Sequence, residues 1–177
     1  MLTLINRVLA LSTFAAHIFL VVGWLYFLFN QNDSRVKKFL RDYGLLFAWL
    51  VALAATASSL FYSEFAGFVP CSLCWWQRIF IYPQAILLGL AWFKRDRQIT
   101  IYSLTLATIG GLIALYHNYI YYGGTAVIPC GAGDLTTSCV KQFVFELNYI
   151  TIPIMSLTSF LLVIFFLWVQ VPKKNEG

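Results

Sequence analysis

Long apolar stretches alternate with short polar segments along this chain. The apolar stretches cover residues 8–29, 43–62, 76–93, 99–122 and 149–171. Wound into a helix, each is long enough to cross the hydrocarbon core of a bilayer, which is about 30 Å thick. A lone strand would leave its backbone polar groups unpaired in lipid, so every span is expected to be helical. The pattern predicts an all-α fold, a polytopic transmembrane helix bundle. Small residues at Gly110, Gly111 and 52–59 are expected where helices approach closely.

The composition agrees with a membrane protein. Of 177 residues, 60% are hydrophobic and 11% are charged, whereas soluble domains carry about 25% charged residues. The spans leave no room for a soluble domain of useful size, so any chemistry is expected in or at the bilayer. The first apolar run is longer than that of a signal peptide, and most nearby cations follow it. We therefore expect it to stay on the protein as an anchor.

The basic residues are unequally divided between the two sides of the predicted spans. Nine of the twelve Lys and Arg residues fall in the segment 30–42, the turn 94–97 and the tail after Pro172. Cytoplasmic loops carry such an excess. The N-terminus and the loops before the third and fifth spans are therefore expected outside, and the C-terminus in the cytoplasm. The net charge of +5 then reflects topology and indicates no nucleic-acid partner.

All four cysteines lie in the two predicted outer loops: Cys71 and Cys74 before the third span, Cys130 and Cys139 before the fifth. Three interpretations compete. Two structural disulfides would suit an oxidising compartment. A zinc site is a second possibility, although a gap of eight residues between Cys130 and Cys139 differs from a compact zinc knuckle. The third is a redox pair, because a C-x-x-C disulfide closes too short a loop to stabilise a fold much and is a common form of an exchanging bond.

The sequence around Cys71 and Cys74 favours the redox interpretation. Pro70 breaks the preceding loop, so the two cysteines are expected at the start of the third helix, where the helix dipole favours thiolate. Arg78 follows Cys74 by four residues and shares its helix face. An arginine on the outer side runs against the charge bias, and a charge inside a span is a functional candidate.

Two histidines complete the set of candidate residues. His117 lies near the outer end of the fourth span, at about the depth of Arg78 in the antiparallel third span. We expect His117 either to face a ligand opposite Arg78 or to be a hydrogen-bonded packing residue. His17, in the first span, is expected to be structural.

The motif "CSLCWWQR" at the start of a span, followed by a second cysteine pair in the next outer loop, resembles the DsbB family of membrane disulfide bond formation proteins, in particular its shorter, BdbC-like branch. The resemblance covers residues 43–171. It divides the chain into an N-terminal anchor with a cytoplasmic loop, residues 1–42, and a four-helix oxidoreductase core, residues 43–177. It implies a multi-pass protein of the bacterial cytoplasmic membrane.

The resemblance also implies a function. Such proteins reoxidise a DsbA-like, thioredoxin-fold dithiol oxidase outside the cytoplasm and pass the electrons to a membrane quinone, ubiquinone or menaquinone. By this resemblance Cys71 and Cys74 form the quinone-proximal pair, and Cys130 and Cys139 the pair that faces the partner. Arg78, and more loosely His117, match the residues beside the quinone, and no metal is implied. Electrons are expected to leave from Cys74.

Two features depart from the better-known branch: the short spacing of Cys130 and Cys139, and the additional N-terminal span. Two other functions remain as alternatives. In an enzyme similar to vitamin K epoxide reductase the loop cysteines precede the C-x-x-C, which is the reverse of the order here. A non-catalytic membrane protein with structural disulfides would need the cysteines only for stability. A transporter is disfavoured because charged midplane residues and broken, repeated helices are missing.

Overall fold

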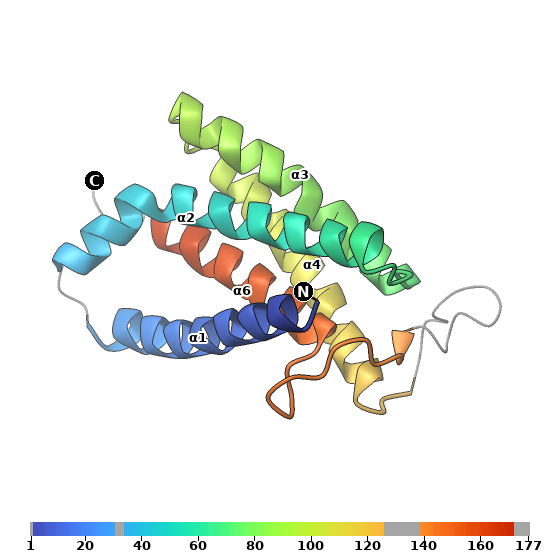
Figure 1. Ribbon diagram of the computed structural model, residues 1–177. Helices are drawn as coiled ribbons and strands as arrows, with labels where there is room; N and C mark the ends of the chain where they lie inside the picture. The colour runs from blue at the N-terminus through green and yellow to red at the C-terminus, as the bar shows by residue number, and fades with distance from the viewer. Residues whose placement is uncertain (1, 31–33, 126–138, 172–177) are drawn as a thin grey trace.

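The computed structural model describes residues 2–30, 34–125 and 139–171, and these form a bundle of long helices (Figure 1). In these ranges no β-strand occurs, so the predicted all-α class is confirmed. The helices are α1 (Leu2–Phe29), α2 (Arg35–Leu60), the π-helix η1 (Phe61–Phe65), α3 (Ser72–Lys94), α4 (Ile99–Tyr121) and α6 (Ile152–Gln170).

Each predicted span forms a helix, but their membrane character differs. In the described part of the chain, α1, α2 with η1, α4 and α6 are long and apolar enough to cross a membrane. Helix α3 is not in that group, because Gln77, Arg78 and Gln84 lower its hydropathy. These three side chains are buried, and α3 packs between α2 and α4. The polar groups of α3 thus face the bundle interior, and a crossing by α3 remains a prediction.

Helix α2 starts earlier than the apolar pattern suggested. Helix α2 begins at Arg35 rather than at residue 43. Ser34 caps it, since its side-chain oxygen accepts a hydrogen bond from the Lys37 backbone N–H, and this satisfies one of the free donors of a helix start. The predicted boundary at residue 42 therefore falls inside α2. The basic residues Arg35, Lys37, Lys38 and Arg41 lie in the first turns of this helix.

Helix α6 is central to the bundle and packs on α1, α2 and α4. Its side chains Phe160, Val163, Phe165 and Leu167 are almost fully buried. Helices α3 and α4 form an antiparallel pair (Figure 1). The end of α4 packs on the start of α6, where Asn118 donates to the Pro153 carbonyl at 2.9 Å. The described parts of both outer loops lie together here: Phe143 stacks on Phe68 with 4.6 Å between ring centroids, and Cys139 packs in a cluster with Cys71.

Gly110 and Gly111 were expected at a close helix contact, and Gly110 marks one. A Cβ atom at position 110 would overlap the aromatic ring of Phe160 on α6, whereas at position 111 the nearest atom would be Phe160 Cβ at an ordinary 3.6 Å. Glycine at 110 therefore lets α4 and α6 approach until the Phe160 ring lies against the α4 backbone.

This difference gives a paired test of the packing. Gly110→Ala is expected to destabilise the protein by about 1–3 kcal/mol, because a methyl group must displace Phe160 in a close-packed interior. Gly111→Ala is the matched control and should be neutral or slightly stabilising, since alanine favours helix more than glycine does. Thermal unfolding of both purified variants in detergent measures the difference. Equal melting temperatures would show that α4 and α6 do not approach this closely.

Candidate functional site

Cys71 begins the site as the N-cap residue of α3. Its backbone is extended, with φ −73° and ψ 170°, and its Sγ accepts a hydrogen bond from the Cys74 backbone N–H at 3.4 Å. The Sγ atoms of Cys71 and Cys74 are 2.9 Å apart, and both cysteines are free. The predicted helix start is therefore correct, and it holds the two sulfur atoms within reach of each other on the first turn.

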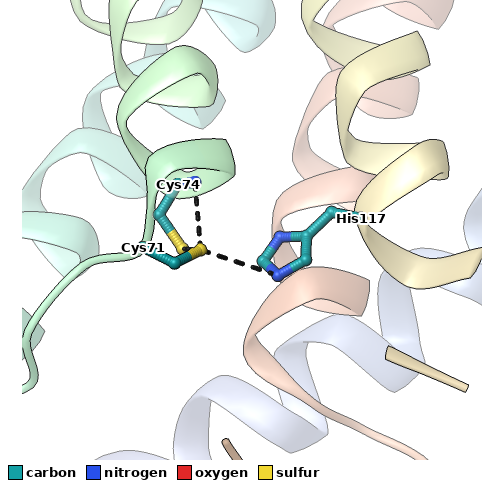
Figure 2. A group of neighbouring side chains, drawn as sticks. All are labelled: Cys71, Cys74 and His117. Atoms are coloured by element: carbon teal, nitrogen blue, oxygen red, sulfur yellow. Dashed lines mark hydrogen bonds between the residues drawn. The ribbon is translucent and has the colours of Figure 1, made fainter. Parts of the chain in front are cut away.

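His117 reaches this pair from α4. Its Nε2 lies 3.8 Å from Cys71 Sγ, and the ring is buried (Figure 2). The sequence placed His117 at the depth of Arg78 as a possible partner across a ligand. In the structure its hydrogen-bonding contact with α3 is made to Cys71 and to Gln77, so His117 belongs first to the cysteine pair.

Gln77 was not recognised as a site residue in the sequence. Its Nε2 lies 3.1 Å from His117 Nδ1. With the amide in this orientation it donates to Nδ1, so the ring carries its proton on Nε2. That nitrogen faces Cys71 Sγ and lies 3.3 Å from the Cys139 carbonyl oxygen. The sequence feature that could have identified Gln77 is its position three residues after Cys74, because residues with this spacing lie on one face of a helix.

These contacts act on the charge of Cys71. The hydrogen bond from the Cys74 side chain lowers the pKa of the Cys71 thiol below its ordinary value. The hydrogen bonds from His117 and from the Cys74 backbone N–H lower this pKa further, while burial opposes them. The net effect favours the thiolate, which is the nucleophilic form of cysteine. The sequence expected activation at Cys74; the structure places these stabilising contacts around Cys71.

Arg78 is held rigidly one turn below the cysteines. Its Nε donates to Ser59 Oγ at 3.0 Å and its Nη2 to the Ser59 carbonyl oxygen at 3.1 Å. The guanidinium also lies 5.1 Å from the ring centroid of Trp75 and 6.0 Å from that of Tyr82. Ser59 of α2 was expected only as a small packing residue. A serine among other small residues of an apolar span gives no sequence signal for this anchoring role.

Cys139 brings the second outer loop to the same place. It is buried, packs in a cluster with Cys71, Leu73 and Ile120, and is disulfide-bonded. Its predicted partner, Cys130, lies outside the described residues. Cysteines from two separate loops therefore meet at one end of the bundle, with His117 beside both Cys71 Sγ and the Cys139 carbonyl group.

A cavity of about 300 Å³ opens beside these residues. Cys71, Cys74, Gln77, Arg78 and His117 all line it, and most of the remaining lining is apolar. Small-molecule sites have this character: a largely apolar hollow of about 300–1,000 Å³ with a few placed polar groups. The cavity therefore has the character of a site for a small, largely apolar ligand with a few hydrogen-bonding atoms.

A metal ion is a second ligand that the cysteines and His117 would suit. One ligand atom from each of Cys71, Cys74 and His117 lies within 4.8 Å of the others. Zinc accepts thiolate and imidazole, but its structural sites use four protein ligands. Cys139 is disulfide-bonded and offers no thiolate. Within the described residues the group is thus a three-donor set, which needs both thiols reduced.

His17, the other histidine, lies elsewhere. Its Nε2 is 2.8 Å from Thr158 Oγ1 and its Nδ1 is 3.3 Å from the Tyr149 hydroxyl oxygen. Both ring nitrogens are occupied by hydrogen bonds that join α1 to α6 and to the segment before it. This agrees with the structural role expected for it.

Comparison with known proteins places the chain among characterised families. The family model for "Disulfide bond formation protein DsbB" matches residues 41–170. The chain is 40% identical over 128 residues to probable disulfide formation protein C 1 of Bacillus anthracis, covering 72% of this chain and 90% of that protein. It is 38% identical over 132 residues to disulfide bond formation protein C of Bacillus subtilis, covering 73% and 93%. A probable disulfide formation protein of Deinococcus radiodurans is 40% identical over 131 residues, covering 70% and 86%. No solved structure matches significantly.

Proposed function

Because the chain belongs to the DsbB family of disulfide bond formation proteins, we propose that it reoxidises an extracytoplasmic, thioredoxin-fold dithiol oxidase similar to DsbA and passes the electrons to a membrane quinone. Family membership and the apolar helices make this a multi-pass bacterial membrane protein of disulfide bond formation.

One observation carries the proposal: Cys139 packs against Cys71 at the end of α3, and His117 contacts both residues. Two structural disulfides would need no such meeting. Thiol–disulfide exchange does need it, because one sulfur atom must attack the other directly. The packing of Cys139 in one cluster with Cys71 supports exchange between these two residues.

The exchange runs in balanced steps. A partner thiolate attacks Cys130 Sγ, Cys139 leaves as thiolate, and the partner's second thiol resolves the mixed disulfide, so the partner is oxidised and the loop pair reduced. Cys139 then attacks the oxidised pair at Cys71, and Cys74 leaves with the electron pair. Cys130 resolves the Cys71–Cys139 bond and restores the loop disulfide. The C-x-x-C pair is now a dithiol, with Cys71 favoured as thiolate.

Arg78, His117 and Gln77 prepare the cavity for the acceptor. A quinone, when bound, supplies the two-electron acceptor that lets the Cys71–Cys74 pair close again. Arg78 holds a fixed positive charge at the cavity wall, and its anchoring to Ser59 keeps it from reorienting. Preorganised charge of this kind stabilises a developing anion without reorganisation cost. His117 holds its Nε2 proton beside Cys71, in the tautomer set by Gln77.

The redox energetics account for the membrane location. A strongly oxidising partner can be reoxidised only by an acceptor of higher potential, and every 30 mV corresponds to about 1.4 kcal/mol for a two-electron couple. Quinones meet this need and are dissolved in lipid. A thiol oxidoreductase built almost entirely of apolar helices therefore brings its cysteines to the acceptor.

The proposed topology places the cysteine end outside and the C-terminus in the cytoplasm. The start of α1 lies at the cysteine end, whereas α6 ends at the opposite end of the bundle (Figure 1). The turn with Lys94, Arg95 and Arg97 and the basic start of α2 also lie at that opposite end. This separation of basic residues from the cysteines supports the positive-inside assignment.

A trapping experiment tests the partner step. In the Cys139→Ser variant the Cys130 thiolate can attack the disulfide of the oxidised thioredoxin-fold partner, whose second cysteine leaves as thiolate. No second loop cysteine can then release Cys130, so this mixed disulfide is expected to accumulate. Non-reducing electrophoresis of membranes, followed by mass spectrometry of the Cys130 peptide, identifies it. The control is the Cys130→Ser/Cys139→Ser double variant, which has no loop thiol. An adduct in neither variant, or equally in both, would contradict exchange through this loop.

A further inference from the structure

Helix α1 is not accounted for by the family to which the chain belongs. The family match starts at residue 41, after α1 has ended at Phe29. In the B. anthracis relative the matched 128 residues make up 90% of the protein, so its unmatched part is shorter than the 28 residues of α1. Any role of α1 must be derived from its own contacts.

The half of α1 far from the cysteines is attached by aromatic packing. Gly23 lies against the ring of Phe165 on α6, where a Cβ atom would come within 2.8 Å of Cζ. Trp24 and Phe27 pack on the same ring with centroid distances of 5.7 and 5.8 Å. Glycine is therefore required at position 23 for α1 to lie close to α6.

Two polar attachments hold the rest of α1. His17 bonds to Thr158 of α6 and to Tyr149, as described above. Nearer the N-terminus, the Tyr62 hydroxyl donates to Asn6 Oδ1 at 2.9 Å, which ties α1 to the end of the α2–η1 segment. Helix α1 is thus fixed on both sides of its stretch between residues 6 and 17.

Between these attachments α1 lines the cavity of the cysteine site. Leu9, Ser12, Thr13 and Ala16 contribute to the lining; we call this set the α1 wall. The two hydroxyl groups are used inside the helix, because Ser12 donates to the Val8 carbonyl at 2.7 Å and Thr13 to the Leu9 carbonyl at 2.8 Å. The α1 wall therefore offers methyl and methylene groups, while α3 and α4 bring the hydrogen-bonding side chains Gln77, Arg78 and His117 to the same cavity.

We propose that α1 completes the quinone site, with the α1 wall contacting the apolar ring substituents and the first isoprenoid unit of the quinone. The inference rests on the proposed function. The cavity is continuous from the cysteines to α1, and its polar groups and its apolar helix wall lie on different elements. A quinone needs both, since its oxygens are polar and its substituents and tail are not. A lipid acyl chain would need only the apolar side.

A matched pair of alanines on α1 tests this wall. Ala16 is half-buried and lines the cavity, whereas its neighbour Ala15 is exposed and does not. Ala16→Phe is expected to raise the KM for a short-tailed ubiquinone about tenfold or more, because the added ring fills the space of a ligand group. Ala15→Phe should leave it unchanged. In both variants the rate at which reduced partner reduces the Cys71–Cys74 disulfide, measured without quinone, should match the unaltered chain.

Photolabelling of the unaltered chain gives a readout that depends neither on turnover nor on folding of a variant. A ubiquinone analogue with an azide on the ring or first isoprenoid unit is expected to label the peptide containing residues 9–16, and Ala16→Phe should weaken that labelling about tenfold. Excess short-tailed ubiquinone should compete, whereas phospholipid should not.

Each outcome decides the inference. Equal KM values for Ala16→Phe and Ala15→Phe, or label confined to α2, α3 and α4, would overturn the role of α1 while leaving quinone reduction intact. Competition by phospholipid alone would make the α1 wall a lipid contact and would also overturn it. An unaltered chain that neither reduces nor binds quinone would remove the proposed function itself.

Discussion

In the Cys71→Ser variant the rate of oxidation of the partner dithiol is expected to fall by a factor of about 10³ or more. Removing one nucleophile from a set of residues that act together removes nearly the whole catalytic effect of the set. Cys71 is the sulfur that packs with Cys139 and carries the contacts favouring thiolate. The substitution is structurally mild. Cys71 is the N-cap of α3, and serine is a preferred N-cap residue whose oxygen can accept the same Cys74 N–H bond. The measurement is oxygen-linked or quinone-linked oxidation of reduced partner by purified protein.

Stability separates this prediction from a structural disulfide. If the cysteines served only stability, Cys71→Ser would lower the melting temperature and leave thiol oxidation outside the cell unchanged. We expect the reverse: an unchanged melting temperature and no oxidation. The companion variant Cys139→Ser should lose oxidation of the protein partner but keep quinone reduction by dithiothreitol, which can reach the C-x-x-C pair directly. If Cys71→Ser continues to oxidise partner, Cys71 is not in the pathway.

Arg78→Ala is expected to lower kcat/KM for quinone by a factor of about 10²–10³, the usual effect of removing one preorganised group that stabilises developing charge. The guanidinium is buried, fixed by both the hydroxyl and the carbonyl of Ser59, and lines the cavity beside Cys74. Arg78 donates its hydrogen bonds to Ser59 of α2, and it follows Cys74 by one helical turn. Reduction of the Cys71–Cys74 disulfide by the partner, followed in a single turnover without quinone, should therefore keep its rate.

Two variants distinguish charge from geometry at Arg78. Arg78→Lys keeps the charge but loses the paired hydrogen bonds to Ser59, so an intermediate kcat/KM is expected. Ser59→Ala removes the hydroxyl part of the anchor and the hydrogen bond from Tyr82 but keeps the carbonyl contact, so it should have a smaller effect than either. Thermal unfolding must accompany both, because Arg78→Ala also removes buried packing. Unchanged quinone kinetics in a folded Arg78→Ala protein would exclude Arg78 from the electron-accepting step.

The sequence alone determined the helical architecture and the start of the site. Apolar length predicted each span, since a chain in lipid must pair its backbone within one helix. Pro70 and the C-x-x-C spacing predicted that α3 would begin at the cysteines, and Arg78 was found because a buried charge in a span is rare. All of these are local properties. They depend on neighbours within one or two helical turns, which the sequence order displays directly.

Only the tertiary structure decided which side chains meet across helices. The contact of His117 with Cys71, the tautomer set by Gln77 and the anchoring of Arg78 by Ser59 depend on the rotation and depth of α2, α3 and α4 relative to one another. Packing fixes these quantities, for instance where Gly110 admits the ring of Phe160 and Gly23 that of Phe165. Hydrophobic periodicity says that a helix is buried but not against what, because lipid and protein interior are equally apolar. The place of α1 beside the cavity could therefore be learned only from the folded chain.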